Sequence, residues 1–249
     1  MRLARAPPTL GSVLHGLGMT SQAPSRTLAS VALTISLLLA VQAAVGPRTI
    51  NDVVKRLEPS SGKRIRFALD AAGVARSPRH LWLLAIKDAG TLELFGENAS
   101  GRRVRIRSWP VLAASGTLGP KLREGDLQVP EGIYRINQLN PNSAYHLSLG
   151  LNYPNAADRA RAALDGRSNL GSDIFIHGKD VSAGCLAIGD VAIEDLFWLA
   201  AAVGMDRFTV VIVPTDLRRA SPKVQGPPWL PELYRELKEE LSRFPVPQR

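Results

Sequence analysis

The pattern of apolar and polar positions beyond residue 79 predicts a series of short strands. Apolar runs at 80–87 ("HLWLLAIK") and 91–96 ("TLELFG") flank the tripeptide 88–90, Asp-Ala-Gly, which is typical of a hairpin turn. Between 102 and 115, apolar residues alternate with arginines at nearly every second position, as in a half-exposed strand. Further strands are predicted at 132–139, around 145–149, at 174–176 and at 208–214.

Helical periodicity is present before the predicted strands, twice among them, and again in the tail that follows them. Residues 48–75 place apolar residues at helix-like spacing before a Pro-Ser-Ser-Gly break. A well-marked helix is predicted at 190–204, with Asp190 as its cap. The other predicted helices are a polar one at 156–164 and an amphipathic one in the tail, where Leu233, Leu237 and Leu241 are four residues apart.

These elements predict a β-rich α+β fold. The strands do not alternate regularly with helices, which argues against a doubly wound parallel sheet. The stretch 115–132 is rich in glycine and proline, so we expect a surface loop there. The predicted organisation is an export segment at 1–43, a helical lead-in at 44–79, a main domain at 80–215 and a C-terminal helical extension at 216–249.

The N-terminal segment has the charge pattern of a secretory signal. Its basic residues Arg2, Arg5 and Arg26 precede an uncharged stretch that contains the apolar run "LASVALTISLLLAV", and no acidic residue occurs before residue 48. Small residues at 41–43 predict cleavage after Ala43. An uncleaved membrane anchor is the alternative, and translation could begin at Met19. Either alternative predicts an exported protein.

The charge and the cysteine count limit the classes of molecule that this protein is expected to bind. Removal of the first 43 residues lowers the formal net charge from +9 to +6, because that segment holds three of the 31 basic residues and no acidic one. A basic surface can bind nucleic acid, but an exported chain rarely meets any, and no helix-turn-helix, RNP or zinc pattern is present. Acidic polymers or membranes of the cell envelope fit the charge better. The single cysteine excludes an internal disulfide.

That cysteine, Cys185, follows a histidine, His177, by eight positions in "SDIFIHGKDVSAGC". A lone cysteine among apolar neighbours can be a small core residue. It can also be a nucleophile if a nearby imidazole accepts its proton. His177 ends a predicted strand, and Gly178 and Gly184 allow the intervening segment to loop back. The amide region of Cys185, preceded by the small Ala183 and Gly184, is a candidate oxyanion hole.

Other chemistries have weaker support in the sequence. His80 and His146 are expected to be structural or surface residues, and Asp180 a solvated charge. The scattered histidines and one cysteine lack the spacing of a zinc site, so no metal or cofactor is predicted. A serine hydrolase is disfavoured because no Gly-x-Ser-x-Gly elbow occurs. Tyr134 and Tyr145 are expected to pack in the core or against strands.

The segments "IHG" at 176–178 and "SAGC" at 182–185 resemble the signature of the L,D-transpeptidase catalytic domain, a family of cysteine enzymes that act on bacterial peptidoglycan. The upstream "VPEGIYRI" at 129–136 is similar to the Thr-Pro-x-Gly-x-Tyr segment of that family, and "SGTLGPKLREGD" fits the loop before it. The resemblance extends from about Leu81 to Pro214. It implies a β-sandwich with a helix after the catalytic cysteine loop and a periplasmic location.

The resemblance also implies roles for individual residues. Cys185 would attack the carbonyl at the L-centre of a diaminopimelate residue and form a thioester, with His177 as base and then acid. Gly184, Ser182 and Gly178 would support the loop or the oxyanion, and a backbone carbonyl near Gly178 would orient the imidazole.

The resemblance further implies that peptidoglycan stem peptides are the partners. Lys121 and Arg123 are candidates for binding the carboxylates of those peptides, because guanidinium and ammonium groups pair with carboxylates. A solvated surface is the alternative for both side chains.

The closest resemblance is to a Gram-negative, periplasmic branch that includes an amidase releasing an outer-membrane lipoprotein from peptidoglycan. Cross-linking members usually have a longer His-to-Cys interval and an Arg or Asn where this chain has Ala187. The acceptor of the acyl group, an amine or water, therefore stays open. A non-catalytic wall-binding module with a buried, unreactive thiol is a further alternative.

Overall fold

The computed structural model describes residues 46–246. The predicted signal segment at 1–43 and its cleavage site lie outside the described residues, as do residues 247–249. The helices are α2 (Ile50–Leu57), α3 (Lys63–Ala71), α4 (Ala156–Leu164), α5 (Asp190–Val203) and α6 (Leu230–Ser242), with a π-helical turn η1 (Glu58–Gly62) and a 3-10 turn η2 (Met205–Arg207). The strands are β1 (Leu81–Ile86), β2 (Thr91–Glu97), β3 (Arg103–Pro110), β4 (Gly132–Asn140), β5 (Ser148–Leu151), β6 (Phe175–His177), β7 (Leu186–Ala187) and β8 (Phe208–Val213).

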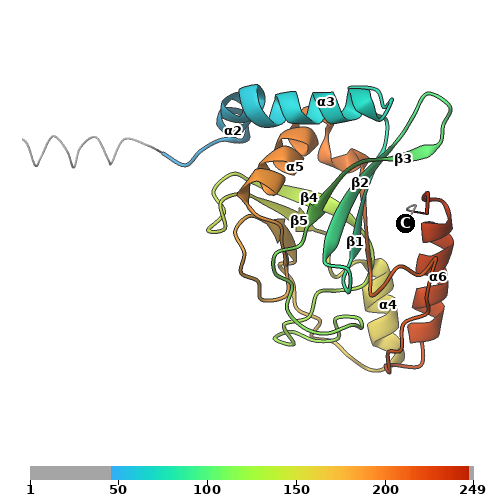
Figure 1. Ribbon diagram of the computed structural model, residues 1–249. Helices are drawn as coiled ribbons and strands as arrows, with labels where there is room; N and C mark the ends of the chain where they lie inside the picture. The colour runs from blue at the N-terminus through green and yellow to red at the C-terminus, as the bar shows by residue number, and fades with distance from the viewer. Residues whose placement is uncertain (1–45, 247–249) are drawn as a thin grey trace, which may run out of the picture. The chain divides into compact units, whose positions relative to one another are not determined.

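The strands within residues 46–246 form one curled eight-stranded sheet in the order β3-β2-β1-β8-β4-β5-β6-β7 (Figure 1). Strand β4 joins two parts of the sheet, β3-β2-β1-β8 on one side and β5-β6-β7 on the other. Its first half, Gly132–Arg135, pairs with β8, and from Ile136 onward it pairs with β5 after a register irregularity. The two layers expected of a sandwich are therefore continuous through β4. The predicted β-rich α+β fold class is confirmed.

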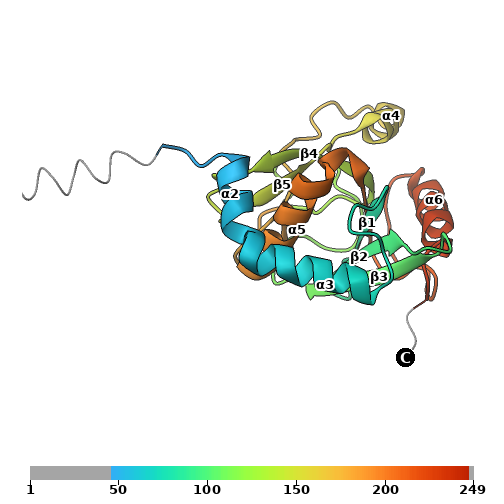
Figure 2. The same cartoon turned by 90° about the horizontal axis from the view of Figure 1, so that it is seen from above.

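The uninterrupted apolar run of β1 reflects a sheet that is covered on both faces. Leu81, Leu83 and Ala85 belong to the hydrophobic cluster that includes α2, α3 and α5. The alternate residues Trp82, Leu84 and Ile86 belong to a second cluster with the apolar side of α6. Figures 1 and 2 show the corresponding arrangement, with α2, α3 and α5 on one side of the sheet and α6 on the other.

The predicted break at Pro-Ser-Ser-Gly is wrong, because residues 58–62 form the π-helical turn that joins α2 to α3. The reason lies in the contact with α5. A Cβ at Gly62 would be 3.0 Å from the Trp198 ring, closer than ordinary van der Waals contact, so the glycine favours this close approach. The indole Nε1 of Trp198 also donates a 2.9 Å hydrogen bond to Glu58. The lead-in helices are thus fitted to α5, the helix that follows the Cys185 loop.

The buried carboxylate of Asp195 connects α5 with α3 and β3. Asp195 of α5 is fully buried, and its Oδ1 accepts a hydrogen bond from Arg64 Nε of α3 at 2.9 Å. Arg107 Nε of β3 lies 3.6 Å from Oδ2. A buried charge needs such partners because desolvation is otherwise costly. The contact fixes α5 with respect to both the lead-in and the sheet.

A second buried ion pair anchors the loop 111–131 to the sheet and to α6. Lys87 Nζ lies 3.0 Å from Glu131 Oε1 and also donates to the carbonyls of Gly119 and Val129. The other Glu131 oxygen accepts a hydrogen bond from the Tyr234 hydroxyl of α6 at 2.9 Å. Burial lowers the pKa of Lys87, whereas Glu131 acts to raise it. The cluster links three segments that are far apart in sequence.

The helix at 190–203 is confirmed, but Asp190 is not its cap. Gly189 precedes the helix in a backbone conformation with φ of 79°, and Asp190 is the first helical residue. Its Oδ1 accepts a 2.9 Å hydrogen bond from the Lys179 amide. Asp190 therefore holds the segment that follows His177 rather than the amides of its own helix.

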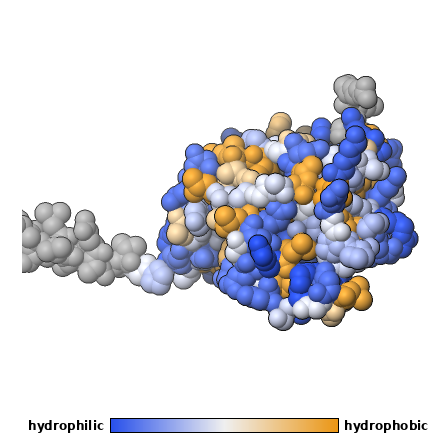
Figure 3. All heavy atoms as spheres, turned by 90° about the horizontal axis from the view of Figure 1, so that it is seen from below, coloured by the Kyte–Doolittle hydropathy of each residue, from blue (hydrophilic) through white to orange (hydrophobic). Residues whose placement is uncertain are grey.

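The surface of the described part combines polar and apolar areas. Figure 3 shows, on the face seen from below, hydrophobic patches separated by hydrophilic side chains. Among the helices that lie within residues 46–246, none has both the length and the apolar character needed to cross a bilayer.

The Lys87–Glu131 pair gives a test of the fold. Lys87→Met is expected to lower the free energy of unfolding by about 3–5 kcal/mol, because it leaves the Glu131 charge buried without its cation. Lys87→Met combined with Glu131→Gln is expected to cost less than the sum of the single changes. Urea unfolding followed by circular dichroism measures both. The exposed Lys238→Met serves as control, and a loss below about 1 kcal/mol for Lys87→Met contradicts the assignment.

Candidate active site

His177 and Cys185 are brought together by two short strands that pair in parallel. Ile176 of β6 is opposite Leu186 of β7, and His177 is opposite Ala187. Cys185 immediately precedes β7, and the Phe175 amide of β6 donates to its Sγ at 3.4 Å. The segment between the two residues therefore loops back, as the sequence predicts.

The imidazole of His177 is buried and is held by the next residue in the chain. Its Nδ1 lies 2.7 Å from the Gly178 carbonyl oxygen, so Nδ1 carries the proton and donates. Nε2 is then the unprotonated nitrogen and can accept a proton. The backbone carbonyl expected near Gly178 is thus present. Burial lowers the pKa of His177, while the Gly178 hydrogen bond acts in the opposite direction.

Gly178 is needed because three groups crowd its α-carbon. A Cβ at this position would lie 2.6 Å from Asp190 Oδ1 and 2.7 Å from the Tyr145 carbonyl oxygen. Its amide donates to Leu147 O at 3.2 Å, next to the start of β5. The residue that orients His177 is therefore packed between the segment before β5 and the first turn of α5.

Tyr145 is the main residue that the sequence reasoning placed wrongly. We expected it in a strand or the core, but β5 begins only at Ser148, and the Tyr145 side chain is 42% exposed. Its ring lies against the imidazole of His177, with centroids 4.5 Å apart and an interplanar angle of 33°. Tyr134, in contrast, is buried as predicted.

The thiol of Cys185 is partly exposed and is neutral at rest. Burial raises its pKa, and the Phe175 amide and the charge of Lys121 lower it only partly. Within the described residues, the polar contacts of Sγ are the Phe175 amide and the Asp173 carbonyl oxygen at 3.6 Å. The directions of the two pKa shifts favour a protonated thiol and a neutral imidazole, which lie on adjacent segments of the sheet.

Two serines fix the backbone around Cys185. Ser182 Oγ accepts from the Cys185 amide at 3.0 Å and donates to the Cys185 carbonyl at 2.6 Å, which closes a tight turn. Ser115 Oγ accepts from the Gly184 amide at 2.5 Å and donates to the Leu127 carbonyl. The amide of Cys185, expected to be open as an oxyanion hole, is thus engaged by a hydroxyl in this structure.

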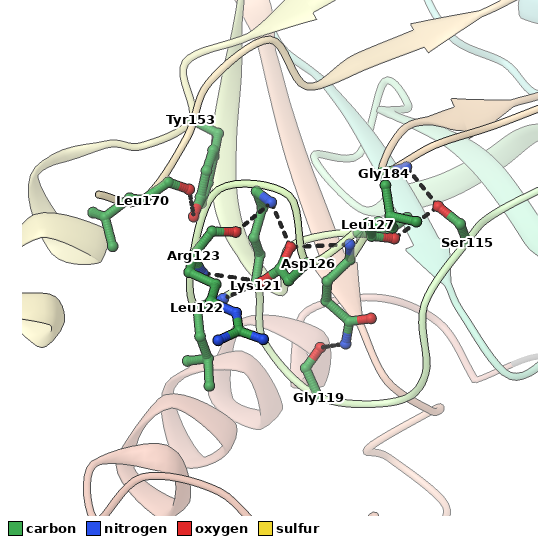
Figure 4. Close-up of polar contacts among 12 residues, drawn as sticks. Ser115, Gly119, Lys121, Leu122, Arg123, Asp126, Leu127, Tyr153, Leu170 and Gly184 are labelled. Carbon is green, nitrogen blue, oxygen red and sulfur yellow. Dashed lines mark hydrogen bonds and ion pairs between the residues drawn. The ribbon is translucent and has the colours of Figure 1, made fainter. Parts of the chain in front are cut away.

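The loop that carries Lys121 and Arg123 lies beside this turn (Figure 4). Lys121 Nζ contacts Asp126 Oδ1 at 2.5 Å and the Arg123 carbonyl at 2.9 Å, and its side chain is only 6% exposed (Figure 4). The Arg123 side chain forms no hydrogen bond or ion pair with the described residues. The expected binding of carboxylates by these two residues stays a prediction, and Lys121 already has an anionic partner.

The residues that flank Cys185 in the chain, Gly184 and Leu186, line two separate hollows. One, of about 140 Å³, is lined by Lys121, Asp173, Ala183 and Gly184 among others. The other, of about 290 Å³, is lined by Leu186 and residues of the segments 85–91 and 111–114. Both hollows therefore lie close to Cys185 in the chain, although the thiol itself lines neither of them.

The remaining candidates are structural, as the sequence predicts. His146 Nε2 lies 2.9 Å from Glu194, and His80 Nε2 lies 2.9 Å from Thr209 Oγ1. In the part of the chain that the structure describes, no group of three or more His, Cys, Asp or Glu residues could hold a metal ion.

A thiol and a backbone-oriented imidazole on adjacent strands define a cysteine–histidine site of the kind that can transfer acyl groups. Comparison with known proteins identifies the family. Residues 83–213 match the YkuD family, described as the L,D-transpeptidase catalytic domain, and the chain therefore belongs to this family.

The chain is also similar to individual proteins. The chain is 31% identical over 169 residues to YafK of Escherichia coli K12, a candidate L,D-transpeptidase, and the match covers 66% of each protein, just under two thirds. Among solved structures, the helical cell shape determining protein Pgp2 from Campylobacter jejuni matches with a TM-score of 0.45 and 18% identity, over 74% of this chain and 78% of Pgp2. L,D-transpeptidase 1 from Mycobacterium tuberculosis matches with a TM-score of 0.31 and 16% identity, over 54% and 62%.

The packing around Gly178 predicts the effect of a small substitution. Gly178→Ala is expected to destabilise the fold by about 1–3 kcal/mol, since the new methyl group forces apart the Tyr145 carbonyl and Asp190. It should also displace the carbonyl that orients His177. Urea unfolding tests the first effect. Gly46→Ala is the control because a Cβ there meets nothing within 4 Å, and an unchanged stability of Gly178→Ala would show the packing to be wrong.

The resting protonation states can be measured directly. Burial lowers the pKa of His177, so we expect its imidazole to lose its proton below the usual value of 6.5, as read from its ring resonances by NMR. Because burial raises the pKa of Cys185, the midpoint of its alkylation rate with iodoacetamide should lie above 9.0. His177→Gln identifies the resonance. An alkylation midpoint below pH 7 would instead mean a preformed thiolate–imidazolium pair.

Proposed function

We propose that this protein is a periplasmic cysteine acyltransferase that acts on peptidoglycan stem peptides. Membership in the L,D-transpeptidase catalytic domain family supports the substrate class. The observation that carries the chemistry is the hydrogen bond from His177 Nδ1 to the Gly178 carbonyl, because it leaves Nε2 free to act as a base next to the strand that bears Cys185. The expected export segment supports the location.

In the first step, the Cys185 thiol gives its proton to His177 Nε2, and Sγ forms a bond to the carbonyl carbon at the L-centre of diaminopimelate. The thiol leaves the Asp173 carbonyl to do so, since that contact holds it in the resting structure. The imidazolium that forms keeps its hydrogen bond to Gly178. This carbonyl stabilises the positive charge without a buried carboxylate.

In the second step, the tetrahedral intermediate collapses to a thioester. The carbon–nitrogen bond breaks, and the proton on His177 Nε2 passes to the leaving nitrogen. The oxyanion before collapse competes with Ser182 and Ser115 for the amides of Cys185 and Gly184, because both amides already donate to these hydroxyls. Rotation of either hydroxyl would release a donor for the oxyanion.

In the third step, an acceptor attacks the thioester and restores the thiol. An amine from a second stem peptide gives a transpeptidase, and the hollows lined by Gly184 and by Leu186 offer room for peptide groups near the site. His177 takes the proton of the acceptor and returns it to sulfur as the bond between carbon and sulfur breaks.

Water is the second candidate acceptor, which would make the protein an amidase that releases stem-peptide products or a lipoprotein. The observation in its favour is Ala187. This side chain is fully buried in β7, and its backbone pairs with Ala113, so position 187 offers no polar group to an acceptor amine.

A non-catalytic wall-binding module fits the site less well. That hypothesis predicts a buried, unreactive thiol. Cys185 is partly exposed and lies beside two hollows, and an oriented imidazole lies on the neighbouring strand.

The proposal predicts a specific loss of activity. The purified protein is incubated with muropeptides and, separately, with lipoprotein-linked peptidoglycan, and the products are identified by mass spectrometry. Cys185→Ala should abolish all turnover because no thioester can form, while the fold persists. Loss of a terminal D-alanine with new dimers indicates transfer to an amine, and monomers or lipoprotein released with added water indicate hydrolysis.

Ser182→Ala provides a matched variant in the same turn. It should retain measurable turnover, since Ser182 orients the loop and does not react. Turnover by Cys185→Ala above background contradicts the mechanism, as does a wild-type protein that converts none of these substrates.

A further inference from the structure

Tyr145 lies between the buried imidazole of His177 and the exposed side chain of Lys179. The Tyr145 ring covers the imidazole, and its hydroxyl has no hydrogen-bond partner among the described residues. Lys179 Nζ lies 5.9 Å from the centroid of the Tyr145 ring and donates a 2.7 Å hydrogen bond to the Ala144 carbonyl. An aromatic ring thus lies against the imidazole, and an ammonium group lies near that ring.

This pair is held by a rigid backbone. The Tyr145 amide donates to Ser143 Oγ at 3.1 Å, and its carbonyl accepts from the Leu147 amide. His146, with φ of 74°, is fixed through its contact with Glu194. On the other side, the Lys179 amide donates to Asp190 Oδ1. Both side chains therefore extend from backbone segments that are held by internal hydrogen bonds.

Lys179 differs from the cation on the other side of the site. Lys121 is nearly buried and contacts Asp126 at 2.5 Å. Lys179 is exposed, and no carboxylate of the described residues lies within ion-pair distance of its ammonium group. Only one of its three donor hydrogens is used by Ala144. An anionic group in this position would gain a hydrogen-bonded ion pair without displacing an internal partner.

The chemistry of the proposed reaction places such an anion here. His177 must protonate the leaving amine, so that nitrogen lies within hydrogen-bond reach of Nε2 and its substituents extend over the surface around the imidazole. When the amine belongs to an amino acid with a free terminus, its carboxylate is only two bonds away. Tyr145 and Lys179 are the groups that the structure offers to it.

We propose that Tyr145 and Lys179 form the subsite for the leaving amine and that Lys179 selects amines that carry a free carboxylate. The inference rests on the proposed acyl transfer. Tyr145 supplies a flat apolar wall with a free hydroxyl, and Lys179 supplies the positive charge. Neither residue takes part in bond making, so both are specificity-determining residues.

The test uses two synthetic stem peptides that differ only at the leaving residue, which ends in a free carboxylate in one and in a primary amide in the other. Wild-type protein is expected to favour the carboxylate in kcat/KM by about 10- to 100-fold, the range for a hydrogen bond between charged groups. Lys179→Met should lose this preference and process both peptides at the rate of the amide. Lys179→Arg should keep most of it.

Lys63→Met, on α3, is the matched control and should behave as wild type. If the wild type converts both peptides equally, or if Lys179→Met keeps the preference, the subsite is wrong although the acyl transfer stands. If neither peptide reacts with wild type while Cys185 is intact, the proposed function itself has failed. The ratio of the two kcat/KM values does not change with a general loss of folded protein, so a merely structural effect of Lys179→Met leaves the preference intact.

Discussion

The hydrogen bond between His177 Nδ1 and the Gly178 carbonyl is the interaction on which the site depends. It fixes the tautomer, directs Nε2 away from the backbone and requires no buried acid. The carbonyl can take this position only because Gly178 has no side chain, since Tyr145 and Asp190 pack against its α-carbon. Asp190 in turn belongs to α5, and α5 is held by Asp195 and by the fit of Gly62 against Trp198. The orientation of the His177 ring therefore depends on the contacts by which the lead-in helices α2 and α3 hold α5.

Local sequence was sufficient for the elements that carry the reacting groups. The strand before His177 could be predicted from its continuous apolar run, and the helix from 190 could be predicted from its helical periodicity and its flanking glycines. The same holds for the hairpin between β1 and β2, where the turn residues match the observed pairing of Ile86 with Thr91. The fold class followed from the number of short apolar runs.

The sequence was insufficient where a contact depends on distant segments. Tyr145 looked like a strand residue because Tyr145, Leu147 and Leu149 alternate with more polar residues, yet His146 with its positive φ precedes β5. Lys121 looked like a free cation, and its partner Asp126 is revealed only by the folded loop. The π-helical turn has the sequence of a break, and contact with Trp198 preserves its helical path. In each case tertiary packing decides between two locally acceptable structures.

The two-sided burial of the sheet bears on where this domain can be divided. The family match ends at residue 213, before α6, but one face of β1 and β8 is covered by that helix. A fragment trimmed to 83–213 would expose Leu84, Ile86 and Val211 to water as a broad apolar surface, which promotes self-association. It would also remove Tyr234 and leave Glu131 with one partner fewer. The evolutionary unit is therefore smaller than the folding unit, and the C-terminal helix belongs to the latter.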